Sequence, residues 1–168
     1  MSEIVVRPAR PDESSAVGRL TLDAYLADGH LAAESPYAAK LADAARRARE
    51  AELLVAADAE GAVLGTVTLA PPGSPWAQVS GPDELEFRML AVAPAARGRG
   101  VGEVLTRAAV DRAVELGLSA VVLSSSLAMR AAHRLYERLG FHRTPHLDWQ
   151  PVPGETLITY RLDLPTEG

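Results

Sequence analysis

The sequence contains no cysteine, which excludes disulfide frameworks, thiolate metal sites and cysteine nucleophiles. It also has no uninterrupted apolar stretch near the roughly 20 residues that cross a bilayer, and its first residues, MSEIVVRPAR, lack the apolar run of a secretory signal. Basic residues are in the minority, with 17 Lys and Arg against 22 Asp and Glu, which argues against broad capture of nucleic acid. We therefore expect a cytoplasmic protein with neither membrane nor nucleic acid as a partner.

The composition is that of one globular domain. Hydrophobic residues make up 48% and charged residues 23% of 168 residues, and there is no repeat, low-complexity tract or linker. We expect a single domain over residues 1–168.

Apolar periodicity, glycine and proline predict alternating strands and helices. Helices are expected from Pro11 to about Gly29 and over 35–49, 101–117 and 129–139. Strands are expected over 3–7, stopped by Pro8, and over 53–57, 62–69, 84–92, 120–123 and 156–164, with room for one more before the last. This order predicts a mixed α+β fold, a central sheet of about six to seven strands with helices on both faces.

A glycine-rich turn, RGRGVG at 97–102, lies between an expected strand and an expected helix. Glycines let successive backbone N–H groups converge, and the helix adds unpaired N–H groups and the positive end of its dipole. Arg97 and Arg99 add forked donors for phosphate oxygens. The turn predicts an anion site suited to a pyrophosphate. No lysine follows as in a P-loop, and the third glycine of a Rossmann fingerprint is missing.

Two other kinds of chemistry are not expected. His142 and His146 are four residues apart, but Pro145 breaks the helix that would align them on a metal. The run Ser124–Ser126 lacks a surrounding G-x-S-x-G elbow, so no covalent serine intermediate is predicted. We expect no metal.

The residues from Glu86 to Phe141 resemble the GNAT (GCN5-related N-acetyltransferase) superfamily. RGRGVG fits its acetyl-CoA signature Q/R-x-x-G-x-G/A, ELEFRMLAVAP resembles its central strand, and AMRAAHRLYERLGF resembles its later helix with Y-x-x-x-G-F. The element order agrees from about Ile4 to the last strand. The resemblance implies a GNAT-like fold and transfer of acetyl from acetyl-CoA to a primary amine by direct attack in a ternary complex.

The resemblance also implies where the cofactor lies. In the family the pantetheine arm pairs with the backbone of the central strand, where a bulge splays it from the next strand, and the pyrophosphate lies on the turn. Methionine at position 129 departs from the asparagine of many members, and the serines before it, Ser125 among them, could turn hydroxyls toward pantetheine instead. The cofactor-binding residues are thus Met89, Leu90, Ala91, Val92, Arg97, Gly98, Arg99, Gly100, Val101, Gly102 and Ser125.

Catalytic roles are carried over in the same way. Glu86 matches a catalytic glutamate that takes the amine proton, directly or through water, with Glu84 beside it as the competitor. Tyr136 matches the general acid that protonates the departing thiolate.

The acceptor is left open. The resemblance places the acceptor side mainly in 1–80 and the acetyl-CoA side mainly in 84–141. Acids of the first two helices would suit a cationic amine, and HRTPHLDW at 142–149 is either a wall of the acceptor cleft, with Asp148 and Trp149 holding a cation, or an ordinary loop. The acids are Asp23, Asp28, Glu34 and Asp43.

We expect the acceptor to be a small-molecule or peptide amine and the protein to be a monomer or homodimer. Three alternatives stay open: another acyl donor, a hydroxyl acceptor, or a non-catalytic acyl-CoA-binding module.

Overall fold

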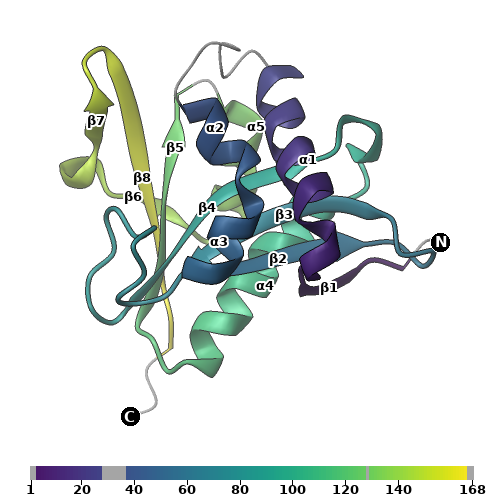
Figure 1. Cartoon of the computed structure of the whole chain (residues 1–168). Helices are drawn as coiled ribbons and strands as arrows, with labels where there is room; N and C mark the ends of the chain where they lie inside the picture. Colours follow the sequence, from purple (N-terminus) through teal and green to yellow (C-terminus); the bar gives the residue numbers. More distant parts are fainter. Residues whose placement is uncertain (1–2, 28–36, 128, 166–168) are drawn as a thin grey trace.

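The computed structural model describes residues 3–27, 37–127 and 129–165, and Figure 1 shows a sheet with helices on both of its faces. The strands are β1 (Val5–Pro8), β2 (Glu52–Ala57), β3 (Val63–Ala70), β4 (Glu84–Val92), β5 (Ala120–Ser126), β6 (His142–Arg143), β7 (Trp149–Val152) and β8 (Glu155–Asp163). The α-helices are α1 (Ser14–Ala27), α2 (Tyr37–Ala42), α3 (Ala44–Glu50), α4 (Val101–Glu115) and α5 (Arg130–Arg138). Single 3-10 turns are η1 (Pro11–Glu13), η2 (Pro94–Ala96) and η3 (Pro145–Leu147).

The strands form one sheet in the order β1-β2-β3-β4-β5-β8-β6, and β7 pairs with β8. Neighbouring strands are antiparallel except β4 and β5, which are parallel and joined through α4. The predicted mixed sheet with helices on both faces is confirmed. The sheet has eight strands because β6 and β7, in a segment expected to be mainly loop, both pair with β8.

The helices divide the core into two layers. In Figure 1, α1, α2 and α3 lie in front of the sheet and α4 lies behind it. The main core packs Val101, Leu105 and Ala109 of α4 and Tyr136 of α5 against the sheet. Two smaller clusters lie under α1, α2 and α3. The residues predicted to bind the cofactor lie mainly on β4 and in the turn that leads into α4.

The helix predicted over 35–49 is two helices in the described part of the chain. Asp43 leaves the helical region, and its side chain accepts a hydrogen bond from the Arg46 backbone N–H at 3.1 Å, so it caps α3. The end of α2 lies against α1 at Gly18, where a Cβ would be 2.1 Å from the Ala42 carbonyl oxygen. The expected helix end at Gly29 lies outside the described residues.

Two strand ends illustrate what local signals can specify. β1 includes the Pro8 that was predicted to stop it and goes no further, and it is an edge strand, where proline is tolerated. β5 continues beyond the expected end at Leu123 to Ser126, because β8 pairs with it as far as Leu157. No helix in the described ranges is both long and apolar enough to cross a membrane.

Candidate active site

Strand β4 carries a bulge at Met89. Its φ of +56° is left-handed. Arg88 pairs with Thr68 and Ala91 pairs with Thr66, so the two residues Met89 and Leu90 lie opposite the single residue between Thr66 and Thr68 on β3. The extra residue switches the side-chain alternation of the strand. Before the bulge Leu85 and Phe87 face the core under α4 and α5, whereas Met89 packs on the α1–α3 side.

Beside this bulge, β4 separates from β5. The two strands pair only from Glu84 with Ala120 to Glu86 with Val122, after which β5 pairs with β8 alone. The backbone groups of β4 beyond Glu86 that point toward β5 therefore have no strand partner. The bulge and the splay predicted for this strand are both present.

The glycine turn then leads into α4. Gly98 has φ +81° and Gly100 has φ +77°, a conformation that favours glycine. Gly100 is the N-cap of α4 and no side chain caps the helix there, so its first-turn N–H groups point outward without an intrahelical partner. A Cβ on either glycine would meet nothing within 4 Å, so the turn borders open space.

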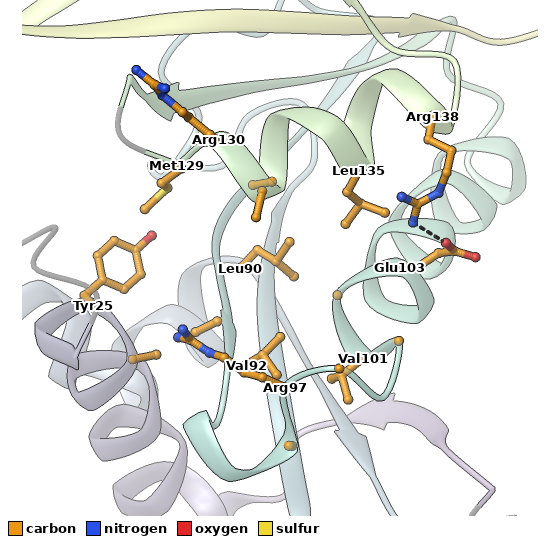
Figure 2. A pocket seen from close by; sticks show the side chains of 18 residues that line it. Tyr25, Leu90, Val92, Arg97, Val101, Glu103, Met129, Arg130, Leu135 and Arg138 are labelled. Carbon is orange, nitrogen blue, oxygen red and sulfur yellow. Dashed lines mark hydrogen bonds and ion pairs between the residues drawn. The ribbon is translucent and has the colours of Figure 1, made fainter.

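These features meet in one cavity of about 580 Å³ (Figure 2). Its walls are β4, the glycine turn, the starts of α4 and α5, and the end of α1. In Figure 2, Leu90 and Leu135 face each other across it, and Arg138 is joined to Glu103 at 2.8 Å on its rim. Arg99 does not line this cavity. The predicted residues that do are Leu90, Ala91, Val92, Arg97, Gly98, Gly100, Val101 and Gly102.

A small recess of about 30 Å³ adjoins the large cavity. The two share Tyr25, Leu90 and Met129. The recess brings together three predicted residues from separate elements. They are Met89, Ser125 and Tyr136.

Tyr136 is buried in an aromatic cluster. Its ring centroid lies 5.7 Å from that of Phe87 and 5.8 Å from those of Phe141 and Tyr160. Burial raises the pKa of the Tyr136 phenol, so the hydroxyl keeps its proton at neutral pH, and the residue lines the recess. Burial likewise raises the pKa of Tyr25 across the recess.

The Ser125 hydroxyl contacts His133 of α5 and Met129, the residue that precedes this helix. Its Oγ lies 3.0 Å from Nε2 of His133 and 3.7 Å from Sδ of Met129. Burial lowers the pKa of His133, which favours the neutral ring at this hydrogen bond. The Ser125 hydroxyl thus lies beside Met129, the position at which the resemblance implies a departure from an asparagine.

Glu86 does not join this recess. Its side chain is fully buried, and Oε1 accepts hydrogen bonds from the N–H groups of Gln78, Val79 and Ser80 at 2.7, 2.8 and 3.1 Å. It lines neither cavity. The competitor Glu84 accepts from the Gly81 N–H and pairs with Arg161.

Of the acids and the aromatic residue suggested for a cationic acceptor, Asp43, Asp148 and Trp149 make other contacts. Asp23 is exposed on α1 and Asp43 caps α3, whereas Asp28 and Glu34 lie outside the described residues. Asp148 accepts from the Thr159 N–H at 2.9 Å and pairs with Arg143, and Trp149 Nε1 donates to Ser124 Oγ at 3.0 Å. Neither cavity is lined by residues 142–149, which were interpreted either as a wall of the acceptor cleft or as an ordinary loop.

Sequence reasoning missed Tyr25 and Arg88, which line the recess. The alternation of polar and apolar residues in ELEFR contained the signal for Arg88, because it puts a charge on the same face as Glu86. Tyr25 had no local signal. Among the residues in the described ranges, no group of three His, Asp or Glu side chains could hold a metal ion.

Comparison with known proteins gives a consistent result. The model of the acetyltransferase (GNAT) family matches residues 19–141. An uncharacterized N-acetyltransferase of Schizosaccharomyces pombe is 32% identical over 112 residues, 67% of this chain and 63% of that protein. A mycothiol acetyltransferase of Pseudarthrobacter chlorophenolicus is 38% identical over 61% of this chain and 32% of its own length. The chain thus spans less than two thirds of these curated relatives.

Solved structures share the whole fold. A GCN5-related N-acetyltransferase from Kribbella flavida superposes with a TM-score of 0.71 at 26% identity, over 96% of this chain and 98% of that one. An acetyltransferase from Salmonella typhimurium, solved with its cofactor acetyl-CoA, gives 0.69 at 23% identity, over 99% and 97%.

Proposed function

The chain belongs to the acetyltransferase (GNAT) family, and from this premise we propose that it transfers the acetyl group of acetyl-CoA to a primary amine by direct attack. The S. pombe relative is named an N-acetyltransferase, and the Salmonella neighbour was solved with acetyl-CoA. Both names support the donor and the acceptor atom proposed here.

One observation carries the proposal. The part of β4 that no longer pairs with β5 and the glycine turn before α4 line the same cavity. An extended amide-containing arm can add to a free strand edge through main-chain hydrogen bonds, as a peptide does. A pyrophosphate can take the N–H groups of a glycine turn at a helix N-terminus. Pantetheine and pyrophosphate are linked in acetyl-CoA, as these two features are linked in this cavity.

The residues have the following proposed places. The backbone of Met89, Leu90, Ala91 and Val92 holds pantetheine, and Ser125 adds a hydroxyl near its thioester end. The turn Arg97–Gly102 holds the pyrophosphate, with Arg97 on the cavity wall as the charged donor. Arg99 belongs to this proposed set by its place in the turn, although it does not line the cavity.

Tyr136 is the proposed acid. The amine lone pair attacks the thioester carbon, the carbon–sulfur bond breaks, and the sulfur leaves with the electron pair. Tyr136 lines the recess beside the proposed end of the pantetheine path, and its hydroxyl would give that sulfur a proton.

Glu86 is proposed as the acceptor of the amine proton through water. Transfer through water is proposed rather than direct transfer, because Glu86 lines neither cavity. Three buried oxygens near this face of β4 have no partner in the described part of the chain, namely Thr68 Oγ1, Ser80 Oγ and Glu86 Oε2. Buried polar groups are normally paired with protein or water. A water molecule bound at Oε2 could relay the proton from the amine to the Glu86 carboxylate.

A matched pair of variants at Gly100 tests the cofactor site. Asn and Asp both tolerate a positive φ and have nearly the same shape, so G100N and G100D differ mainly in charge. We expect G100D to bind acetyl-CoA at least tenfold more weakly than G100N, measured by calorimetry. The pair G61N and G61D, at φ +86° in the β2–β3 turn, should not differ. Equal affinity of G100N and G100D would remove the pyrophosphate from this turn.

Catalysis needs its own measurement, since an acyl-CoA-binding module would pass the binding test. Free thiol released from acetyl-CoA in the presence of a panel of amines reports transfer. Tight binding with no thiol release for any amine or alcohol would favour the binding module.

A further inference from the structure

Arg88 is the charged residue among the described residues that line the recess. The rest of the recess lining is aromatic, aliphatic or hydroxyl-bearing. The phenols of Tyr25 and Tyr136 stay neutral, and no acidic side chain of the described chain lines the recess. In the large cavity the acidic lining residue, Glu103, is engaged by Arg107 and Arg138.

The guanidinium of Arg88 is fixed in place. Nη1 donates to the Trp76 carbonyl at 3.1 Å, Nη2 donates to the Tyr37 hydroxyl at 3.2 Å, and the group lies 5.5 Å from the Trp76 ring centroid. These contacts use part of a fork of five N–H donors and hold its plane. A fork held in this way matches the two oxygens of a carboxylate.

The position of Arg88 relative to the thioester follows from the proposed function, on which this inference rests. The pantetheine path along β4 ends at Met89, and Arg88 is its neighbour on the strand. An amine that attacks the thioester at this point would bring its nearest substituents toward Arg88, which lines the recess. A cation there would be repelled, whereas a carboxylate would be paired.

We propose that the acceptor is an amine that carries a carboxylate close to the reacting nitrogen, as an α-amino acid does, and that Arg88 binds this carboxylate. Pairing the carboxylate also removes a negative charge that stabilises the neighbouring ammonium, so the nitrogen loses its proton more easily. This effect suits a site in which the proposed proton acceptor, Glu86, lies off the wall. The apolar lining from Phe87 and Met129 favours an apolar side chain on the acceptor.

The test compares amines that differ only in the carboxylate. L-Leucine and L-leucinamide form one pair, glycine and glycinamide a second, and 1,4-diaminobutane is the cationic amine. We expect kcat/KM, from thiol release, to be on the order of 10–100-fold higher for each acid than for its amide, the range of a charge-assisted hydrogen-bonded pair. Equal or better use of the amides or the diamine would overturn the assignment while leaving amine acetylation intact. Thiol release with none of these amines would overturn the proposed function itself.

Variants assign the preference to Arg88. R88Q should lose most of the acid-over-amide preference and keep the KM for acetyl-CoA, whereas R88K should keep part of the preference. R46Q is the matched control, because Arg46 stacks on the same Trp76 ring at 5.9 Å but is exposed and lines neither cavity. An R88Q enzyme with the parental preference would remove Arg88 from acceptor recognition. If R88Q does not fold, the wild-type comparison of acids with amides still decides the substrate class.

Discussion

The Oγ of Ser125 lies 3.0 Å from Nε2 of His133, so a hydroxyl on the recess wall and an imidazole on α5 form one hydrogen-bonded unit. This contact joins β5 to α5 at the point where Met129 begins the helix without a side-chain cap.

The first prediction concerns the pH dependence of stability. Burial lowers the pKa of His133 below its ordinary 6.5, so the unfolded chain binds a proton that the folded ring resists. This contribution to the free energy of unfolding is complete above about pH 6.5 and is lost as pH falls from there through the lowered pKa. Urea denaturation at pH 7.5 and 5.5 should show a larger loss for the parent than for H133Q. An equal loss in both proteins would show that His133 titrates normally.

Tyr136→Phe should lower kcat and leave the KM for acetyl-CoA nearly unchanged. The substitution removes only the hydroxyl and keeps the ring that packs on Phe87 and Phe141. General acids typically contribute on the order of 10²–10⁴-fold. Y160F is the control, since the Tyr160 hydroxyl donates to Glu137 at 3.0 Å and not toward the recess. Steady-state kinetics with unchanged kcat for Y136F would reduce Tyr136 to a packing residue.

Glu86→Gln separates a proton acceptor from a structural anchor. If Glu86 takes the amine proton through water, E86Q should lose rate most at neutral pH and recover part of it at high pH, where more amine is already neutral. An amide oxygen can still accept from the 78–80 backbone, so the fold should survive. A lowered Tm with parental rates at every pH would instead make Glu86 only the anchor of that segment. E84Q, which loses a pair with Arg161, reports the cost of removing a neighbouring charge.

Gly65→Ala should weaken both the fold and the binding of acetyl-CoA. A Cβ at Gly65 would lie 2.7 Å from Val101 Cγ1 and 2.9 Å from the Ala91 carbonyl oxygen, so α4 must move at its first residue. Overpacking of this kind costs about 1–3 kcal/mol. Displacing the start of α4 should also raise the Kd for acetyl-CoA severalfold. G81A, whose Cβ would lie 3.5 Å from a flexible Glu84 side chain, should change neither quantity.

Local signals predicted the part of the fold that is specified locally. β4 has the expected bounds, and the glycine turn and α4 follow it, because proline, glycine and helical periodicity are visible within a short stretch. The sequence left room for one strand before the last but did not locate β6 or β7, since a pair of residues and a segment containing Pro151 become strands only through pairing with β8. Their formation depends on tertiary contacts that no local pattern encodes.

The same distinction applies to the site. The cofactor residues from Leu90 to Gly102 lie close together in sequence, so a motif could indicate most of them. The recess draws on α1, β4, β5 and α5, and its composition depends on how those elements pack. Glu86 and Arg88 occupy the same face of β4, yet the backbone of 78–80 covers one and leaves the other at the recess. Spacing alone cannot decide which of two such residues is reached by a ligand.

The divergence of β4 from β5 gives the sheet an additional edge in its interior. Outer edges can be protected by short strands and proline, as β1 ends in Pro8, but an inner edge must stay open to accept a ligand. The sheet is therefore complete only when something occupies that gap as a surrogate strand. Backbone amides of β4 beyond Glu86 should exchange with deuterium like those of a peripheral strand, despite their central place in the sheet, and slow when acetyl-CoA is added. The co-substrate would then contribute to the architecture of the protein as well as to its reaction.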